Sequence, residues 1–174
     1  MAHIKKLNFL KNHKDLVDEN YGMVAVPTFS DNMDKDLEEL FKSQNKTGKV
    51  GDLVFEIDNN SRIVYYGLGD SSDKTAENFR RAAGEVVGYA LQHKYSDIAV
   101  ECPVTDEGEY FCQAFAEGLI LSSYRFLDYF TDERGEYHLK SITMVDACNQ
   151  DAAKKGAIIA SAVCDSRDLG NHPG

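Results

Sequence analysis

The 174-residue sequence has no apolar run approaching twenty residues, so no membrane-spanning helix is expected. Its N-terminal stretch contains lysines but lacks the apolar segment of a secretory signal peptide, and we expect no such signal. The sequence has no tryptophan and only three prolines, and otherwise has the composition of an ordinary soluble globular protein. A chain of this length is sufficient for one domain with a full core.

Cysteine motifs are also absent. The four cysteines contain no C-x-x-C pair, and they are Cys102, Cys112, Cys148 and Cys164. A zinc knuckle is therefore not predicted, and a disulfide framework is not typical of so long a chain. We expect free, buried thiols in a reducing cytoplasm.

Recognisable catalytic motifs are missing as well. No histidine lies three or four residues from another, and the five are His3, His13, His93, His138 and His172. No helix face would therefore present two histidine ligands, and H-E-x-x-H is absent. The sequence also has no G-x-S-x-G elbow. We predict no catalytic residue and no metal ligand.

The net charge is −10 and the isoelectric point about 4.9. This balance argues against a non-specific nucleic-acid or anionic-membrane surface, because both require clustered cations. A negative net charge does not exclude a local basic patch. The small groups of basic residues in the sequence are Arg80, Arg81, Arg125, Lys154 and Lys155.

The hydrophobic pattern predicts strands that alternate with helices. Strands are expected at residues 3–10, 21–29, 50–57, 62–67, 98–102 and 139–145. Helices are expected at residues 34–43, from residue 74 to about His93, at 106–123 and from about 147 to 170. Asp31 or Asn32 is a plausible cap of the first helix. The order predicts parallel neighbours, with a hairpin after residue 50 that makes the sheet mixed, and hence a three-layer α/β/α sandwich.

A glycine-rich turn between a strand and a helix is a weak candidate for an anion site. The candidate donors belong to Gly67, Gly69, Ser71 and Ser72. The pattern lacks a third glycine at dinucleotide spacing, and Asp70 and Asp73 would repel an anion. The alternative is a tight strand-to-helix turn with Ser72 or Asp73 as the helix cap.

The last helix resembles a connector. Ala152, Gly156, Ile159, Val163 and Arg167 recur at steps of three and four and are predicted to share one face. Its apolar residues Ala152, Ile159 and Val163 are expected to pack on the rest of the domain. We expect residues 1–150 to form the domain. Residues 151–174 would be an interdomain helix and the start of a linker to a further domain.

Three segments carry a resemblance to a known family. The first is Tyr66-Gly67-Leu68-Gly69 with Arg80-Arg81-Ala82-Ala83-Gly84 in the next helix. The second is AFAEGLILSSYRF at 114–126, and the third is ASAVCDSRDLGNHPG at 160–174. In this order and spacing they resemble the N-terminal domain of the leucyl (cytosol) aminopeptidase family and the helix that leads into its peptidase domain.

The resemblance implies a cytosolic metallo-exopeptidase that releases N-terminal residues from peptides and assembles as a homohexamer. It implies an N-terminal domain similar to a macro domain, and a C-terminal domain that holds two divalent metals, zinc or manganese, through Asp, Glu and Lys. None of those ligand motifs occurs in this sequence. We therefore expect a chain that ends before the catalytic domain, with no cofactor of its own and no peptidase activity.

Three functions follow from these expectations. The first is a non-catalytic domain that contributes to assembly and to active-site access of the whole enzyme. The second is a nucleotide or ADP-ribose module that uses the glycine turn. The third is a DNA-binding accessory domain, which the net charge disfavours.

Overall fold

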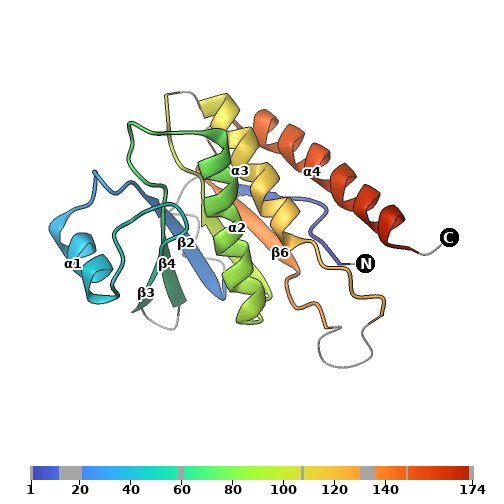
Figure 1. The fold of residues 1–174 in the computed structure, drawn as a ribbon, viewed down its shortest axis with the longest axis horizontal. Coiled ribbons are helices and arrows are strands. Elements are labelled where there is room, and N and C mark those ends of the chain that lie inside the picture. Colours follow the sequence, from blue (N-terminus) through green and yellow to red (C-terminus); the bar gives the residue numbers. More distant parts are fainter. Residues whose placement is uncertain are drawn as a thin grey trace.

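The computed structural model describes residues 2–11, 21–58, 61–106, 108–129, 136–147 and 149–172. Within these ranges the strands form one six-stranded sheet in the order β1-β6-β5-β2-β4-β3 (Figure 1). Their bounds are β1 Asn8–Leu10, β2 Met23–Thr28, β3 Leu53–Asp58, β4 Ser61–Gly67, β5 Asp97–Glu101 and β6 Ser141–Val145. The predicted strands are confirmed, although the first covers only the end of its predicted range.

The sheet is mixed, as predicted. β3 and β4 form the antiparallel hairpin, with Phe55 opposite Val64. The other pairs are parallel, and in the centre Val24 of β2 lies between Ile63 of β4 and Ala99 of β5. Parallel neighbours require crossover connections, and helices supply most of them here.

The helices lie on both faces of this sheet. Their bounds are α1 Lys35–Ser43, α2 Ala76–Gln92, α3 Gly108–Ser123 and α4 Gln150–Asn171. On one face, Tyr66 of β4 stacks on Phe115 of α3 with ring centroids 5.8 Å apart. On the other, Tyr65 lines a hollow together with Leu37 and Leu40 of α1. Because successive strand residues point to opposite faces, α1 and α3 cover opposite sides, and the three-layer α/β/α class is confirmed.

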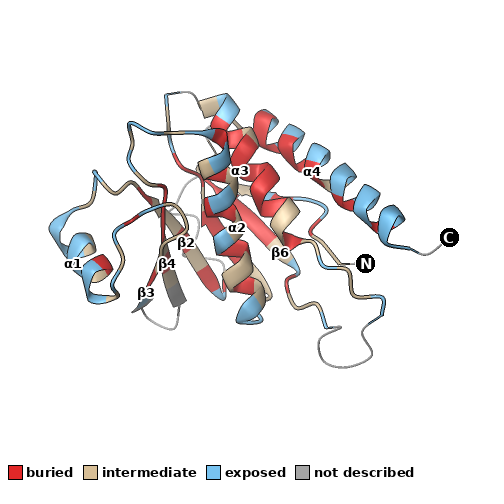
Figure 2. Cartoon of the chain, in the orientation of Figure 1, coloured by how far each residue is buried: buried red, intermediate tan, exposed pale blue. Residues whose placement is uncertain are grey.

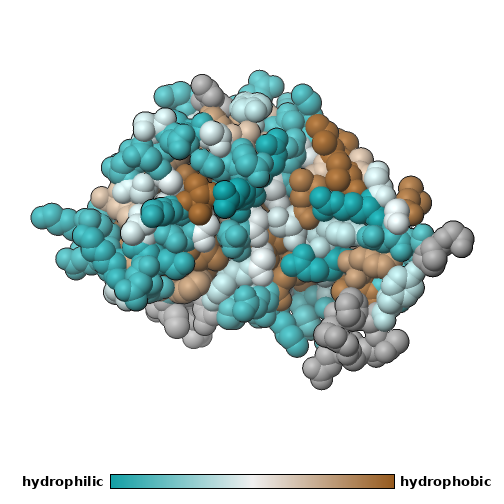
Figure 3. Space-filling view, viewed as in Figure 1, coloured by the Kyte–Doolittle hydropathy of each residue, from teal (hydrophilic) through white to brown (hydrophobic). Residues whose placement is uncertain are grey.

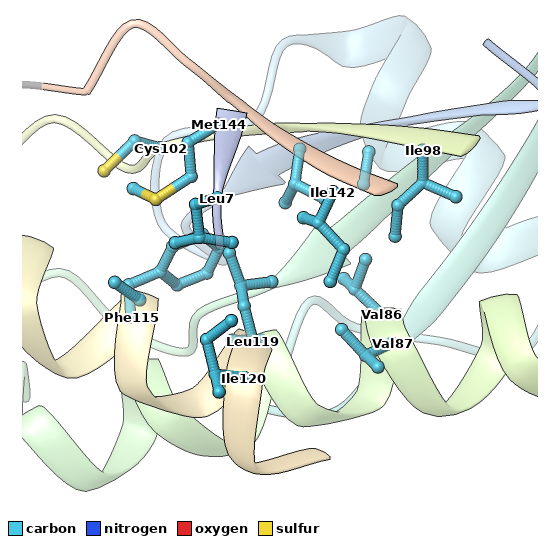
Figure 4. Close-up of a cluster of buried hydrophobic side chains, with 14 of the residues drawn as sticks. Leu7, Val86, Val87, Ile98, Cys102, Phe115, Leu119, Ile120, Ile142 and Met144 are labelled. Atoms are coloured by element: carbon cyan, nitrogen blue, oxygen red, sulfur yellow. The ribbon is translucent and has the colours of Figure 1, made fainter. Parts of the chain in front are cut away.

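The main core lies between the sheet and the layer formed by α2, α3 and α4. Figure 4 shows Ile98, Ile142 and Met144 of the sheet facing Val86 of α2 and Phe115 of α3. These side chains are at most 1% exposed. Burial of branched apolar side chains from both layers is the dominant favourable term in folding.

α3 is the middle helix of this layer and is buried around most of its circumference (Figure 2). A helix that is apolar on nearly all sides needs neighbours on all of them. Two glycines allow these neighbours to come close. A Cβ on Gly118 would lie 2.6 Å from the carbonyl oxygen of Arg80 in α2, and one on Gly156 of α4 would lie 2.4 Å from that of Gln113 in α3.

The predicted buried face of α4 is partly wrong. Ile159 and Val163 are 42% and 40% exposed. The side that packs on α3 consists mainly of small residues, because the two helix backbones lie too close together to leave room for branched side chains. Its buried residues are Ala152, Ala153, Gly156, Ala157, Ala160, Cys164 and Asp168.

Both predicted caps differ from those observed. Asp34 caps α1, accepting a hydrogen bond from the Leu37 N–H at 2.8 Å, rather than Asp31 or Asn32. Thr75 caps α2, accepting from the Asn78 N–H at 3.1 Å. Each cap lies three residues before the N–H that it satisfies, as N-caps do.

Two further expectations concern thiols and membranes. Cys102, Cys112 and Cys164 are buried, as predicted, and Cys148 lies outside the described residues. Among the helices of the described ranges, none has the length and apolarity needed to cross a membrane. The likeness to a macro domain stays a prediction.

The glycine contacts generate a stability prediction. We expect Gly118→Ala and Gly156→Ala each to lower the free energy of unfolding by about 1–3 kcal/mol, because the new methyl group meets backbone atoms. Gly88→Ala is the matched control, since a Cβ there has no atom within 4 Å. It should be neutral or stabilise by about 0.5–1 kcal/mol, as Ala does over Gly in a helix. Urea unfolding measures all three, and equal stability of Gly118→Ala and Gly88→Ala would contradict the packing.

Candidate functional site

The carboxyl ends of β2 and β5 form a topological switch point. From β2 the chain leads toward α1 and the β3–β4 hairpin, whereas from β5 it leads through α3 to β6 on the opposite side. Open α/β sheets bind ligands in the crevice at such a point. A cavity of about 360 Å³ lies here, lined by Val26, Pro27, Thr28, Phe29, Asn32, Glu101, Cys102, Pro103 and Val104. It is the candidate binding site of the domain.

The predicted glycine turn lies beside this cleft. The Leu68 N–H donates to the Thr28 carbonyl at 2.9 Å, which ties the turn to the end of β2. The N–H of Gly67 donates to Asp52 and that of Gly69 to Gly48, each to a backbone carbonyl at 2.9 and 3.0 Å. All three consecutive N–H groups of the turn therefore already have acceptors within the protein.

The two serines of the turn are bound to carboxylates. Ser71 donates to Asp31 through its N–H at 2.9 Å and through its hydroxyl. Ser72 donates to Asp70 through its N–H at 2.8 Å and its hydroxyl at 2.6 Å. The hydroxyl and N–H of Ser71 hold the pKa of Asp31 below its usual value, so this carboxylate is ionised at neutral pH. The donors that a phosphate would need are occupied by anions, which favours the tight-turn interpretation.

The lack of space at the turn and its backbone conformation explain why glycines are needed there, without any bound ligand. A Cβ on Gly67 would lie 2.3 Å from the Lys49 carbonyl oxygen, and Gly69 has a φ of +81°. The first glycine is needed for close approach of the 48–49 backbone, and the second for a left-handed conformation. Sequence reasoning identified the turn correctly but could not identify these partners.

Two arginines of the basic clusters form contacts within the protein. Arg80 forms an ion pair with Glu117 of α3, with Nη2 and Oε2 2.7 Å apart. Arg125 donates to the carbonyls of Ser122 and Tyr124 at 3.2 and 2.8 Å. Guanidinium groups held by carboxylates and carbonyls are poorly placed to neutralise phosphates. This arrangement disfavours the DNA-binding alternative.

One group of side chains was not anticipated from the sequence. The structure brings His3 of the N-terminal segment to Asp165 and Asp168 of α4, with one potential ligand atom of each within 4.8 Å of the others. The three-residue spacing of the aspartates in the sequence indicates that they share a face of a helix. The sequence does not indicate that His3 approaches them, because this contact depends on the packing of distant segments.

Comparison with known proteins assigns the chain to a family. Residues 17–133 match the family described as the cytosol aminopeptidase family, N-terminal domain. The chain is 34% identical over 116 residues to a "Probable cytosol aminopeptidase" of Mycobacterium bovis (strain BCG / Pasteur 1173P2), which is 64% of this chain and 22% of that protein. The chain therefore spans less than a quarter of the length of this relative.

Solved structures agree on the fold. A tomato leucine aminopeptidase mutant superposes with a TM-score of 0.75 at 18% identity, covering 97% of this chain and 39% of that one. A bottromycin maturation enzyme, BotP, in complex with Mn superposes with a TM-score of 0.73 at 22% identity, covering 88% and 32%. At these identities the likeness concerns the fold alone. With the family match over residues 17–133, the chain belongs to the cytosol aminopeptidase family, as its N-terminal domain.

Proposed function

We propose that this chain is the non-catalytic N-terminal domain of a cytoplasmic, metal-dependent exopeptidase that releases N-terminal amino acids from peptides. The observation that carries the proposal is the match to the N-terminal domain of the family, in a chain that covers only 22% of a full-length relative. Catalysis then belongs to a C-terminal peptidase domain outside these residues.

The metals implied by the family do not fit the residues present here. The family resemblance implies two ions held by Asp, Glu and Lys. The one potential metal group among the described residues consists of a histidine and two aspartates, without lysine or glutamate. We therefore assign no catalytic step to this chain and propose that two zinc or manganese ions act in the peptidase domain.

The contribution of this domain is proposed to be assembly of a homohexamer and shaping of access to the active site. Support comes from the outward face of α4, where Ile158, Ile159, Val163 and Leu169 are 70%, 42%, 40% and 78% exposed. Figure 3 shows hydrophobic surface along this helix. Isolated exposed apolar residues are ordinary, but several along one helix are typical of an interaction surface. In the connector role predicted for residues 151–174, α4 would also set the angle between the two domains.

A second candidate is a nucleotide or ADP-ribose module. The cleft at the switch point of β2 and β5 supports it, because ligands bind there in related sheets. The cleft includes Glu101, and Asp31 and Asp70 hold the neighbouring serine donors. These carboxylates oppose a pyrophosphate, so we rank this candidate second.

The first proposal predicts no peptidase activity. The purified chain should not hydrolyse leucine p-nitroanilide above the buffer rate with either manganese or zinc added, because the ligands and bases of the reaction lie in another domain. Release of p-nitroaniline measures this. Metal-dependent turnover that follows the protein through successive purification steps would contradict the proposal.

The assembly role predicts self-association through α4. Wild-type protein should associate as its concentration rises, and Ile158→Glu/Leu169→Glu should remain monomeric in sedimentation velocity. Unfolding free energy should change by no more than about 0.5 kcal/mol, because both side chains are exposed. Val104→Glu is the matched control, since Val104 is 72% exposed but lies at the β2–β5 cleft. Equal association of the double variant and wild type would contradict a role for this face.

The second candidate is tested by ligand titration. With ADP-ribose at millimolar concentration we expect no change in melting temperature, because the turn donors are occupied and the rim is acidic. An increase of several degrees that saturates with ligand would instead promote the nucleotide-binding role. Asp31→Asn, which removes one of the opposing charges, tests whether any such binding uses the turn.

A further inference from the structure

We propose that His3, Asp165 and Asp168 form a binding site for one divalent transition-metal ion, with zinc the best fit. The ligand atoms of the three side chains lie within 4.8 Å of one another. Asp165 and Asp168 lie three residues apart on α4 and so share a face, and His3 approaches that face from the N-terminal segment. The site is formed by two segments at opposite ends of the chain.

Asp168 provides the main reason to expect an ion. The residue is fully buried, and its Oδ1 accepts a hydrogen bond from the Tyr124 hydroxyl at 3.0 Å. Its Oδ2 is also buried and has no hydrogen-bond partner. Burying a carboxylate oxygen without a partner is costly, and native structures rarely leave one unexplained. A cation bound through Oδ2, as proposed here, would satisfy it.

His3 is held in place by the backbone on both sides. Ala2 and Arg125 form a bridge, with N···O distances of 3.3 and 2.8 Å, and the Ile4 N–H donates to the Ser123 hydroxyl at 2.9 Å. The His3 side chain is 1% exposed, so its ring cannot turn freely into solvent. A ligand fixed in this way loses little conformational freedom when it binds a metal.

The spacing is close to that of a zinc site. His3 Nε2 and Asp165 Oδ1 are 3.7 Å apart. Zinc binds histidine nitrogen and carboxylate oxygen at about 2.0–2.2 Å, which places tetrahedral ligands about 3.4 Å from each other. Modest side-chain movement would therefore complete the three protein ligands. The Asp165 side chain is 55% exposed, which gives an ion and a fourth, water ligand a path from solvent.

Charge and ligand type select the metal. Two carboxylates and a neutral imidazole balance one divalent cation. Imidazole favours zinc, whereas magnesium and calcium prefer oxygen ligands alone. The Arg167 guanidinium lies 5.7 Å from the centroid of the Tyr124 ring, whose hydroxyl donates to Asp168, and as a cation it would work against binding.

The consequence would be a metal clamp between the N-terminal segment and the C-terminal half of α4. This revises the expectation that the chain has no cofactor of its own, and it does not depend on the proposed peptidase role. The competing explanation for the same residues is that His3 contacts Asp165 and the Ser161 hydroxyl directly, with Nε2 3.7 and 3.4 Å from their oxygens, without any metal.

Zinc titration of protein without added histidines distinguishes the two explanations. Isothermal titration with zinc chloride at pH 7.5 should give about one ion per chain. At a zinc concentration of about 100 times Kd, the melting temperature should rise by about 5–10 °C and return to its starting value with EDTA. Magnesium chloride should have no comparable effect. No zinc binding by the wild-type chain would overturn the proposal and leave the direct contacts of His3 with Asp165 and Ser161.

Variants then locate the ion. His3→Gln and Asp168→Asn should each weaken zinc binding at least about tenfold, no less than the loss of an outer-shell partner causes. Asp165→Asn should weaken zinc binding to the same extent. Because the Asp165 side chain is exposed, this variant should fold and can serve as the test if Asp168→Asn does not fold. Asp151→Asn is the control, because its side chain is on α4 and 96% exposed. Zinc binding that is unchanged in His3→Gln and Asp165→Asn would overturn the assignment.

Discussion

The close approach of α2, α3 and α4 is the constraint on which the rest of the structure depends. α3 packs against the sheet and lies between α2 and α4. At Gly118 and Gly156 the helix backbones are so close that a single added methyl group would meet backbone atoms of the neighbouring helix. Small residues at both contacts make the helical layer dense. Protein interiors tolerate little change of volume at such contacts, so this layer fixes how α2, α3 and α4 pack against one another.

This packing explains why large apolar residues of α4 are found on its outside. The inner face is filled by alanines, Gly156 and Cys164, and Ile158 and Leu169 are left exposed. Hydrophobic periodicity favours large side chains as markers of the buried face. It therefore identified the helix but assigned Ile159 and Val163 to the wrong side. The predicted connector role of residues 151–174 stays a prediction, although α4 packs along α3 as part of the same helical layer.

Local patterns were sufficient for most of the fold and insufficient for the site. The two strands expected at residues 50–57 and 62–67 predicted the β3–β4 hairpin, because that information lies within neighbouring residues. The partners of Gly67 and Gly69 come from Asp52 and Gly48, whose approach is a tertiary contact. His3 and Asp165 meet only because the segment around His3 and helix α4 both pack against α3. The family was recognisable from three separated segments without any of these contacts.

Native-state hydrogen exchange tests the central claim most directly, namely that α4 belongs to the same cooperative unit as α3 and the sheet. Amides of Ala157 and Ala160 in α4 should exchange with the same free energy of opening as those of Leu119 in α3 and Val100 in β5, since all are buried in one core. If the α4 amides instead open several kcal/mol more easily, as a separate unit, the helical layer does not hold the fold together as described.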